Sequence, residues 1–181
     1  MVGEVEISLS RRAFRGYSFD DVAVVPSRRT RDPEDVNVNW SIDAFTFAMP
    51  VVAAPMDSVM SPETAIQIGK LGGLGVLNLE GLWTRYENPE TAYTEISEFS
   101  ETEATEGLQR LYEEPIKKEL INSRLQQIRD AGVTVAGALS PQRTQEFSDV
   151  VLAAGVDMFV IRGTTVSAEH VSANREPLNL K

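Results

Sequence analysis

Residues 71–81 read LGGLGVLNLEG: a glycine pair, an apolar run and then polar residues. The ten residues before this stretch begin with Ser61-Pro62, a pair suited to the cap and the first position of a helix. Gly72-Gly73 is suited to end that helix, because glycine adopts the left-handed conformation at little cost. The stretch therefore predicts a helix that leads directly into a strand. Its apolar run does not alternate with polar residues, which is typical of a strand buried on both faces.

The same order of helix, small residue, glycine and apolar strand occurs twice more. Ala131-Gly132 precedes one apolar run and Ala154-Gly155 precedes another. Residues 50–54 form an earlier apolar run that no helix and glycine precede. The four strands are expected to begin near Val51, Leu74, Val133 and Met158. Apolar strands that are each separated by a helix indicate an α/β fold with a parallel sheet covered by helices.

Two segments stand outside this repeat. Residues 1–48 are predicted to form an N-terminal arm with a strand at 22–26 and a hairpin within 36–47. Residues 82–115 are rich in glutamate but also contain aromatic residues at helical spacing, so a helical insertion on the outside of the fold is favoured over a low-complexity tail. The remainder of 49–181 is then the main domain.

Composition excludes several classes of function. The net charge of −10 opposes binding to nucleic acid or to an anionic membrane surface. A small anionic ligand stays compatible, because backbone N–H groups bind anions locally. The absence of cysteine among these 181 residues excludes disulfides, zinc–thiolate sites and a cysteine nucleophile within them, and no metal site is predicted. No apolar run approaches the ~20 residues of a membrane span, and no secretion signal is recognised, so the protein is predicted to be cytoplasmic.

Polar side chains follow the predicted strands at the end where parallel α/β folds bind ligands. Met56 and Asp57 follow the first strand, Asn78 follows the second, and Arg162 with Gly163 follows the fourth. A methionine can pack on a flat ring, and a carboxylate and an amide can hydrogen-bond a polar ligand. An arginine beside a glycine can approach a phosphate or carboxylate.

Each of these residues also has a structural interpretation. Asp57 as a cap and Met56 as core filling are favoured by the local pattern, because caps at strand ends are common. A turn whose side chain satisfies the backbone explains Asn78, and a salt bridge explains Arg162, equally well. Ser140-Pro141 favours a helix start over a functional role.

Three phrases, in order, resemble the opening of the IMP dehydrogenase/GMP reductase family. They are YSFDDVAVVP at 17–26, APMDSV at 54–59 and LGGLGVL at 71–77. Residues 167–171 and 176–181 resemble a divergent bacterial branch that is described as IMP dehydrogenase-related. The resemblance implies a (β/α)₈ TIM barrel, of which about the first four β/α units are present.

The resemblance also implies an activity. It is hydride transfer between a nicotinamide cofactor and a purine nucleoside monophosphate, which interconverts IMP and XMP or GMP and IMP. Met56 matches a family position that contacts the purine base, and Asp57 lies in the same loop. With Asn78 at the end of the next strand, these three residues are the expected substrate-binding set.

The cofactor implied by the resemblance is NAD or NADP. Arg162, Gly163 and Thr164 occupy the strand-end loop that touches the nicotinamide nucleotide in IMP dehydrogenases. The catalytic cysteine and a monovalent-cation site are expected beyond Lys181, so this chain alone is expected to be inactive. The full-length protein is expected to be a homo-oligomer, a tetramer or larger.

Two departures from the family pattern favour a rival interpretation. Ala54 stands where family members usually have serine, and Arg162-Gly163-Thr164 stands where IMP dehydrogenases have an aspartate followed by serines. The rival is a non-catalytic nucleotide-binding or assembly protein on the same scaffold. Another phosphate-binding barrel enzyme is a third, weaker alternative.

Overall fold

The computed structural model describes residues 4–8, 11–26 and 28–163, and the chain divides into two compact units, 1–37 and 38–181. The first unit contains an antiparallel hairpin and two 3₁₀ turns. Their bounds are β1 Glu4–Ser8, β2 Arg11–Phe14, η1 Phe19–Asp21 and η2 Pro33–Asp35. The prediction of a strand at 22–26 is wrong. This segment pairs with no described strand and leaves Val24 99% exposed, because an apolar run becomes a strand only where a partner completes its hydrogen bonds.

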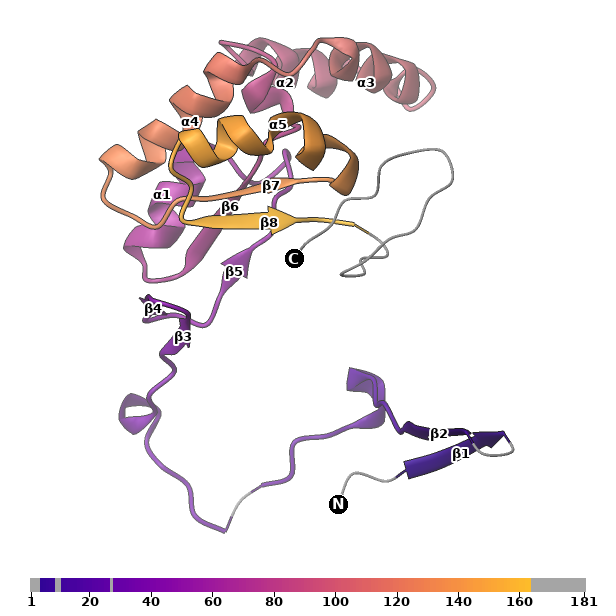
Figure 1. The fold of residues 1–181 in the computed structure, drawn as a ribbon, viewed down its shortest axis with the longest axis vertical. Coiled ribbons are helices and arrows are strands. Elements are labelled where there is room, and N and C mark those ends of the chain that lie inside the picture. The colour runs from indigo at the N-terminus through magenta and orange to yellow at the C-terminus, as the bar shows by residue number, and fades with distance from the viewer. Residues whose placement is uncertain (1–3, 9–10, 27, 164–181) are drawn as a thin grey trace. The chain divides into compact units, whose positions relative to one another are not determined.

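The second unit begins with the expected hairpin and continues into a four-stranded parallel sheet in the order β5-β6-β7-β8. The strands are β3 Trp40–Ile42, β4 Phe45–Phe47, β5 Val52–Ala53, β6 Leu74–Asn78, β7 Ala136–Leu139 and β8 Met158–Ile161. The helices are α1 Pro62–Lys70, η3 Leu82–Thr84, α2 Glu90–Glu98, α3 Ala104–Glu113, α4 Lys118–Asp130 and α5 Pro141–Ala153. Helices α1, α4 and α5 lie along one side of the sheet (Figure 1). The predicted α/β class and the first half of a barrel are confirmed.

The third strand begins three residues later than predicted, at Ala136 instead of Val133. The N–H of Val135 donates to the side chain of Asp157 at 2.8 Å, so a carboxylate takes the place of a strand partner there. Val133 packs against the helical core next to Gly69. The apolar run therefore contains one residue that serves helix packing before the strand itself starts.

Both faces of the sheet are covered, by different elements. On the helical side, Leu77, Leu79 and Leu139 pack with apolar residues of the helices in the larger core. On the other side, Val76 is 1% exposed and packs with Phe47 of the hairpin. The polypeptide backbones of α1 and β6 approach closely at Gly75. A Cβ there would lie 2.6 Å from the Cα of Ala65 and would push the helix away.

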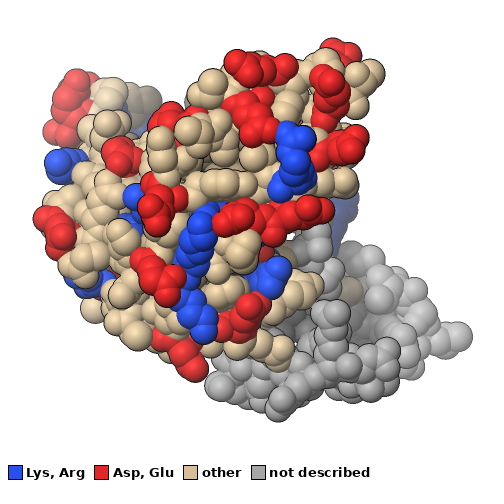
Figure 2. Space-filling view, turned by 90° about the horizontal axis from the view of Figure 1, so that it is seen from above, with Lys and Arg blue, Asp and Glu red and all other residues tan. Residues whose placement is uncertain are grey.

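The surface of the helical side carries many acidic side chains with fewer basic ones between them (Figure 2), in keeping with the net charge of −10. No helix among the described residues is long and apolar enough to cross a bilayer.

The two outer strands lead to a first prediction, about association. β5 and β8 pair on one side only within the described part of the chain, and Val51 and Val52 on or beside β5 are 42% and 55% exposed. Open strand edges with apolar side chains favour pairing with another chain. We expect the purified 181-residue chain to sediment as oligomers or aggregates, and Val52→Lys to reduce this association, because a lysine opposes edge pairing. A wild-type monomer in sedimentation velocity would contradict the prediction.

Candidate functional site

The carboxyl ends of the four strands meet at one end of the sheet. Arg162, directly after β8, donates a hydrogen bond from Nη1 to the carbonyl oxygen of Pro55, shortly after β5, at 2.7 Å. β5 and β8 are the two outer strands, and three strand spacings in a flat sheet span about 14 Å. One side chain joins them, so the sheet is strongly curved, as a barrel requires.

Asp57 is the centre of this end of the sheet. Its Oδ1 accepts a hydrogen bond from Nδ2 of Asn78 at 2.8 Å, and its Oδ2 accepts from the N–H of Leu82 at 2.7 Å. The hydroxyl of Tyr112 also donates to Oδ2, at 2.7 Å, and that of Tyr93 donates to the Asp57 carbonyl oxygen at 2.9 Å. The loop after β5 is thereby tied to the loop after β6 and to helices α2 and α3.

The surroundings of Asp57 raise the pKa of both tyrosines. Burial, and then the negative charge of Asp57, raise the pKa of Tyr93 to about 12. Burial, followed by the hydrogen bond to Asp57, raises the pKa of Tyr112 further above its ordinary value. A phenol is already protonated at neutral pH, so the raised pKa values mean that both hydroxyls remain hydrogen-bond donors further into the alkaline range.

The side chain of Asn78 is also held by hydrogen bonds. The residue is 8% exposed, its Nδ2 is bonded to Asp57, and its Oδ1 accepts from the N–H of Glu80 at 3.1 Å. In this structure the amide of Asn78 thus forms hydrogen bonds with Asp57 and Glu80. Met56, by contrast, is 51% exposed on a loop whose backbone these contacts fix. An exposed thioether on an ordered loop is a contact surface for a flat apolar ligand.

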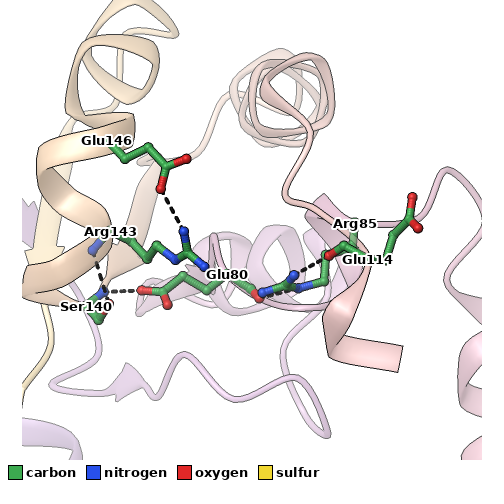
Figure 3. A network of polar contacts seen from close by, with 6 residues as sticks. All are labelled: Glu80, Arg85, Glu114, Ser140, Arg143 and Glu146. Carbon is green, nitrogen blue, oxygen red and sulfur yellow. Dashed lines mark hydrogen bonds and ion pairs between the residues drawn. The ribbon is translucent and has the colours of Figure 1, made fainter. Parts of the chain in front are cut away.

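A second polar network lies beside the first and joins the ends of β6 and β7 (Figure 3). The N–H of Ser140, at the start of α5, donates to the Glu80 carboxylate, and Nε of Arg85 donates to the Glu80 carbonyl oxygen at 2.9 Å. Arg143 in the first turn of α5 pairs with Glu146 at 2.7 Å. Burial, and then the charge of Arg143, lower the pKa of Arg85. Carboxylate and carbonyl oxygens thus accept from Ser140, Arg85 and Arg143 at this end of the sheet.

The structure brings Met56, Asp57, Asn78 and Arg162 to the same end of the sheet. Gly163 follows as an exposed residue, and Thr164 lies outside the described residues. Within the described ranges, no three histidine, aspartate or glutamate side chains are grouped as ligands for a metal ion.

Sequence reasoning missed Tyr93, Tyr112 and Arg85 as parts of this end of the sheet. The two tyrosines are 36 and 55 residues from Asp57 in the chain, and they lie in the segment 82–115, whose aromatic residues predict only a helical insertion. Arg85 follows the 3₁₀ turn η3, and its burial, at 8% exposure, is visible only in the structure.

The model of the IMP dehydrogenase / GMP reductase domain matches residues 16–175. This chain belongs to that family. Its curved half-ring of parallel strands, with helices on one side and strand-end loops gathered at one end, is the arrangement that the family resemblance led us to expect.

Relatives within the IMP dehydrogenase/GMP reductase family differ in how much they share with the chain. Uncharacterized oxidoreductases of Mycolicibacterium smegmatis and Mycobacterium tuberculosis are each 46% identical over 182 residues, which is 98% of this chain and 48% of each relative. Inosine-5'-monophosphate dehydrogenase of Methanocaldococcus jannaschii is 39% identical over 66 residues, 36% of this chain and 13% of that protein.

A solved structure is similar to nearly the whole chain. It is an IMP dehydrogenase/GMP reductase-like protein from Corynebacterium glutamicum, 45% identical with a TM-score of 0.81, and the match covers 94% of this chain and 47% of that one. The chain thus spans about half the length of the curated relatives it matches.

Proposed function

We propose that these residues form the first half of the barrel of a longer oxidoreductase, which transfers hydride between a purine nucleoside monophosphate and a nicotinamide cofactor. The observation that carries the proposal is the exposed Met56 on a hydrogen-bonded strand-end loop, in a chain that belongs to the IMP dehydrogenase/GMP reductase family. The names of the relatives, which include oxidoreductases and an inosine-5'-monophosphate dehydrogenase, support the same reaction class.

In this proposal Met56 packs on the purine ring, because a polarisable thioether makes favourable contacts with an aromatic face. Asp57 and Asn78 contribute by holding the loop, since their side chains are bonded to one another at 2.8 Å. A loop that is ordered before the ligand binds loses less conformational entropy on binding. Substrate recognition here thus combines one exposed contact with two residues that fix it.

Arg162 and Gly163, with Thr164 next in the chain, are the residues proposed to hold the nicotinamide cofactor. The bond to Pro55 uses one Nη atom of an exposed guanidinium that carries five N–H donors, so the group fits a phosphate as well. Gly163 is exposed beside it and leaves room for close approach. When bound, the cofactor would supply or accept the hydride.

The nucleophile of the proposed reaction comes from outside this chain. The mechanism that the family resemblance implies is covalent: a cysteine thiolate adds to the purine ring. None of these 181 residues is a cysteine. The rival proposal, a non-catalytic nucleotide-binding or assembly protein, is favoured by Arg162-Gly163-Thr164, which replaces the aspartate and serines of IMP dehydrogenases.

Hydride transfer by two preparations tests this proposal. We expect the full-length protein that contains these residues to change the absorbance of the nicotinamide cofactor with either IMP plus NAD⁺ or GMP plus NADPH. The 181-residue chain alone is expected to give no signal, because it lacks the thiolate. Binding of IMP or GMP by the full-length protein without turnover in either assay would favour the rival. Turnover by the isolated chain would refute the thiolate mechanism.

A further inference from the structure

The acidic insertion between β6 and α4 reaches the strand-end loop through two tyrosines. Tyr93 of α2 donates to the carbonyl oxygen of Asp57, and Tyr112 of α3 donates to its carboxylate. Each of the two helices of the insertion therefore makes a direct contact with the same residue after β5. The contact by Tyr112 is the one that bears on the orientation of the side chain.

The insertion is attached to the barrel independently of these tyrosines. Nη1 of Arg85 donates to the carbonyl oxygen of Glu114, and the N–H of Lys117 donates to that of Thr84 at 2.8 Å, so the two ends of the insertion are joined. Arg124 of α4 donates to the carbonyl oxygen of Trp83 at 3.1 Å. Removing one tyrosine hydroxyl thus leaves the base of the insertion in place.

The insertion also has a small apolar core of its own. Leu82, Ala92 and Leu111 are buried there, at 0%, 2% and 6% exposure, and Phe99 packs against them. Tyr86 belongs to this cluster, and its hydroxyl donates to the carbonyl oxygen of Leu111 at 3.0 Å. Tyr86 is therefore a matched control for Tyr112. Both tyrosines lie in the insertion and donate a hydrogen bond from the hydroxyl, but only that of Tyr112 goes to Asp57.

We infer that Tyr112 is a positioning residue for the candidate site: it orients the Asp57 carboxylate and so couples the insertion to the loop that presents Met56. The identity of the ligand rests on the proposed function. The positioning of Asp57 by Tyr112 rests on the hydrogen bonds alone. With Tyr112 in place, Oδ2 of Asp57 is held where it meets the N–H of Leu82, and Oδ1 where it meets Asn78. Because coupling between two sites is reciprocal, a ligand that packs on Met56 also stabilises the contact of α3 with the loop.

Amide hydrogen exchange on the full-length protein tests the geometric part without any ligand. We expect Tyr112→Phe to accelerate exchange at Leu82, whose N–H is bonded to Asp57, and at Met60, whose N–H is bonded to the Met56 carbonyl oxygen, by about 10-fold. Tyr86→Phe is expected to leave both amides unchanged. Equal acceleration by the two variants, or none by Tyr112→Phe, overturns the inference.

Nucleotide affinity tests the functional part. We expect Tyr112→Phe to raise the Kd for IMP or GMP by about 5- to 10-fold, and to do so much less when Asp57 is already asparagine, since residues that act through one another are not additive. An unchanged Kd, or an equal effect in the Asp57→Asn background, overturns the coupling to the ligand. If the wild type binds neither nucleotide, the proposed function fails, and hydrogen exchange alone decides whether Tyr112 positions the loop.

Discussion

Replacing Asp57 by alanine is expected to lower the free energy of unfolding by about 2–5 kcal/mol. The substitution removes the acceptor for Asn78, for the N–H of Leu82 and for Tyr112. Asn78 is 8% exposed, so water does not readily replace the lost partner. A buried donor left without a partner costs about 1–3 kcal/mol, whereas the bond of Tyr112, a residue that is 37% exposed, contributes less.

Urea unfolding of the full-length protein, followed by tryptophan fluorescence, measures this loss. Trp83 reports on the region, because its ring lies 6.4 Å from that of Tyr93, whose hydroxyl is bonded to Asp57. Asp57→Asn is the control: it keeps one acceptor oxygen and should give an intermediate loss. An Asp57→Ala protein within about 0.5 kcal/mol of the wild type, the range typical of surface substitutions, would show that Asp57 does not hold the two loops together.

The sequence predicts the parts of the fold that depend on local chemistry. Ser61 and Ser140 cap α1 and α5 as their positions indicate, accepting from Thr64 and Arg143 at 3.0 and 3.4 Å. The glycines that precede β6, β7 and β8 include Gly72, Gly132 and Gly155, all with positive φ. Caps and positive-φ turns involve residues three or four apart, so they can be recognised without knowing the tertiary structure.

The two errors in strand position arise where tertiary contacts decide. Val24 lies in a run that is as apolar as β6, but no described strand pairs with it. Val133 lies in an apolar run and packs on the helical core before the strand begins. Composition alone cannot separate an apolar residue that contacts a helix from one that extends a sheet, because both are buried for the same reason.

The sequence predicts where the candidate site lies in the fold, but not which residues form its hydrogen bonds. The rule that ligand sites form at the carboxyl ends of parallel strands brought Met56, Asp57, Asn78 and Arg162 together correctly as neighbours of one sheet end. The helical periodicity of the insertion indicated α2 and α3. It did not indicate which residues face Asp57, because that depends on the angle at which the insertion packs.

Gly81 makes the hydrogen bonds of Asp57 sterically feasible, and this leads to the last prediction. A Cβ at Gly81 would lie 1.8 Å from Oδ1 of Asp57 and 2.4 Å from its Cγ, far inside van der Waals contact. The backbone of Gly81, at φ −84° and ψ −172°, is accessible to alanine. The cost of Gly81→Ala is therefore the collision itself, which expels the carboxylate from Asn78 and Leu82. We expect a loss of stability of about 2–5 kcal/mol, comparable to that of Asp57→Ala.

The double variant Gly81→Ala with Asp57→Ala separates collision from any other effect of the new methyl group. Once the carboxylate is absent, the methyl group has room, so we expect the double variant to be about as stable as Asp57→Ala alone. Gly16→Ala serves as the neutral control, because a Cβ at Gly16 meets nothing within 4 Å. Urea midpoints of the four full-length variants decide the matter. Additive losses in the double variant would mean that Gly81 is required for a reason other than the space it leaves for Asp57.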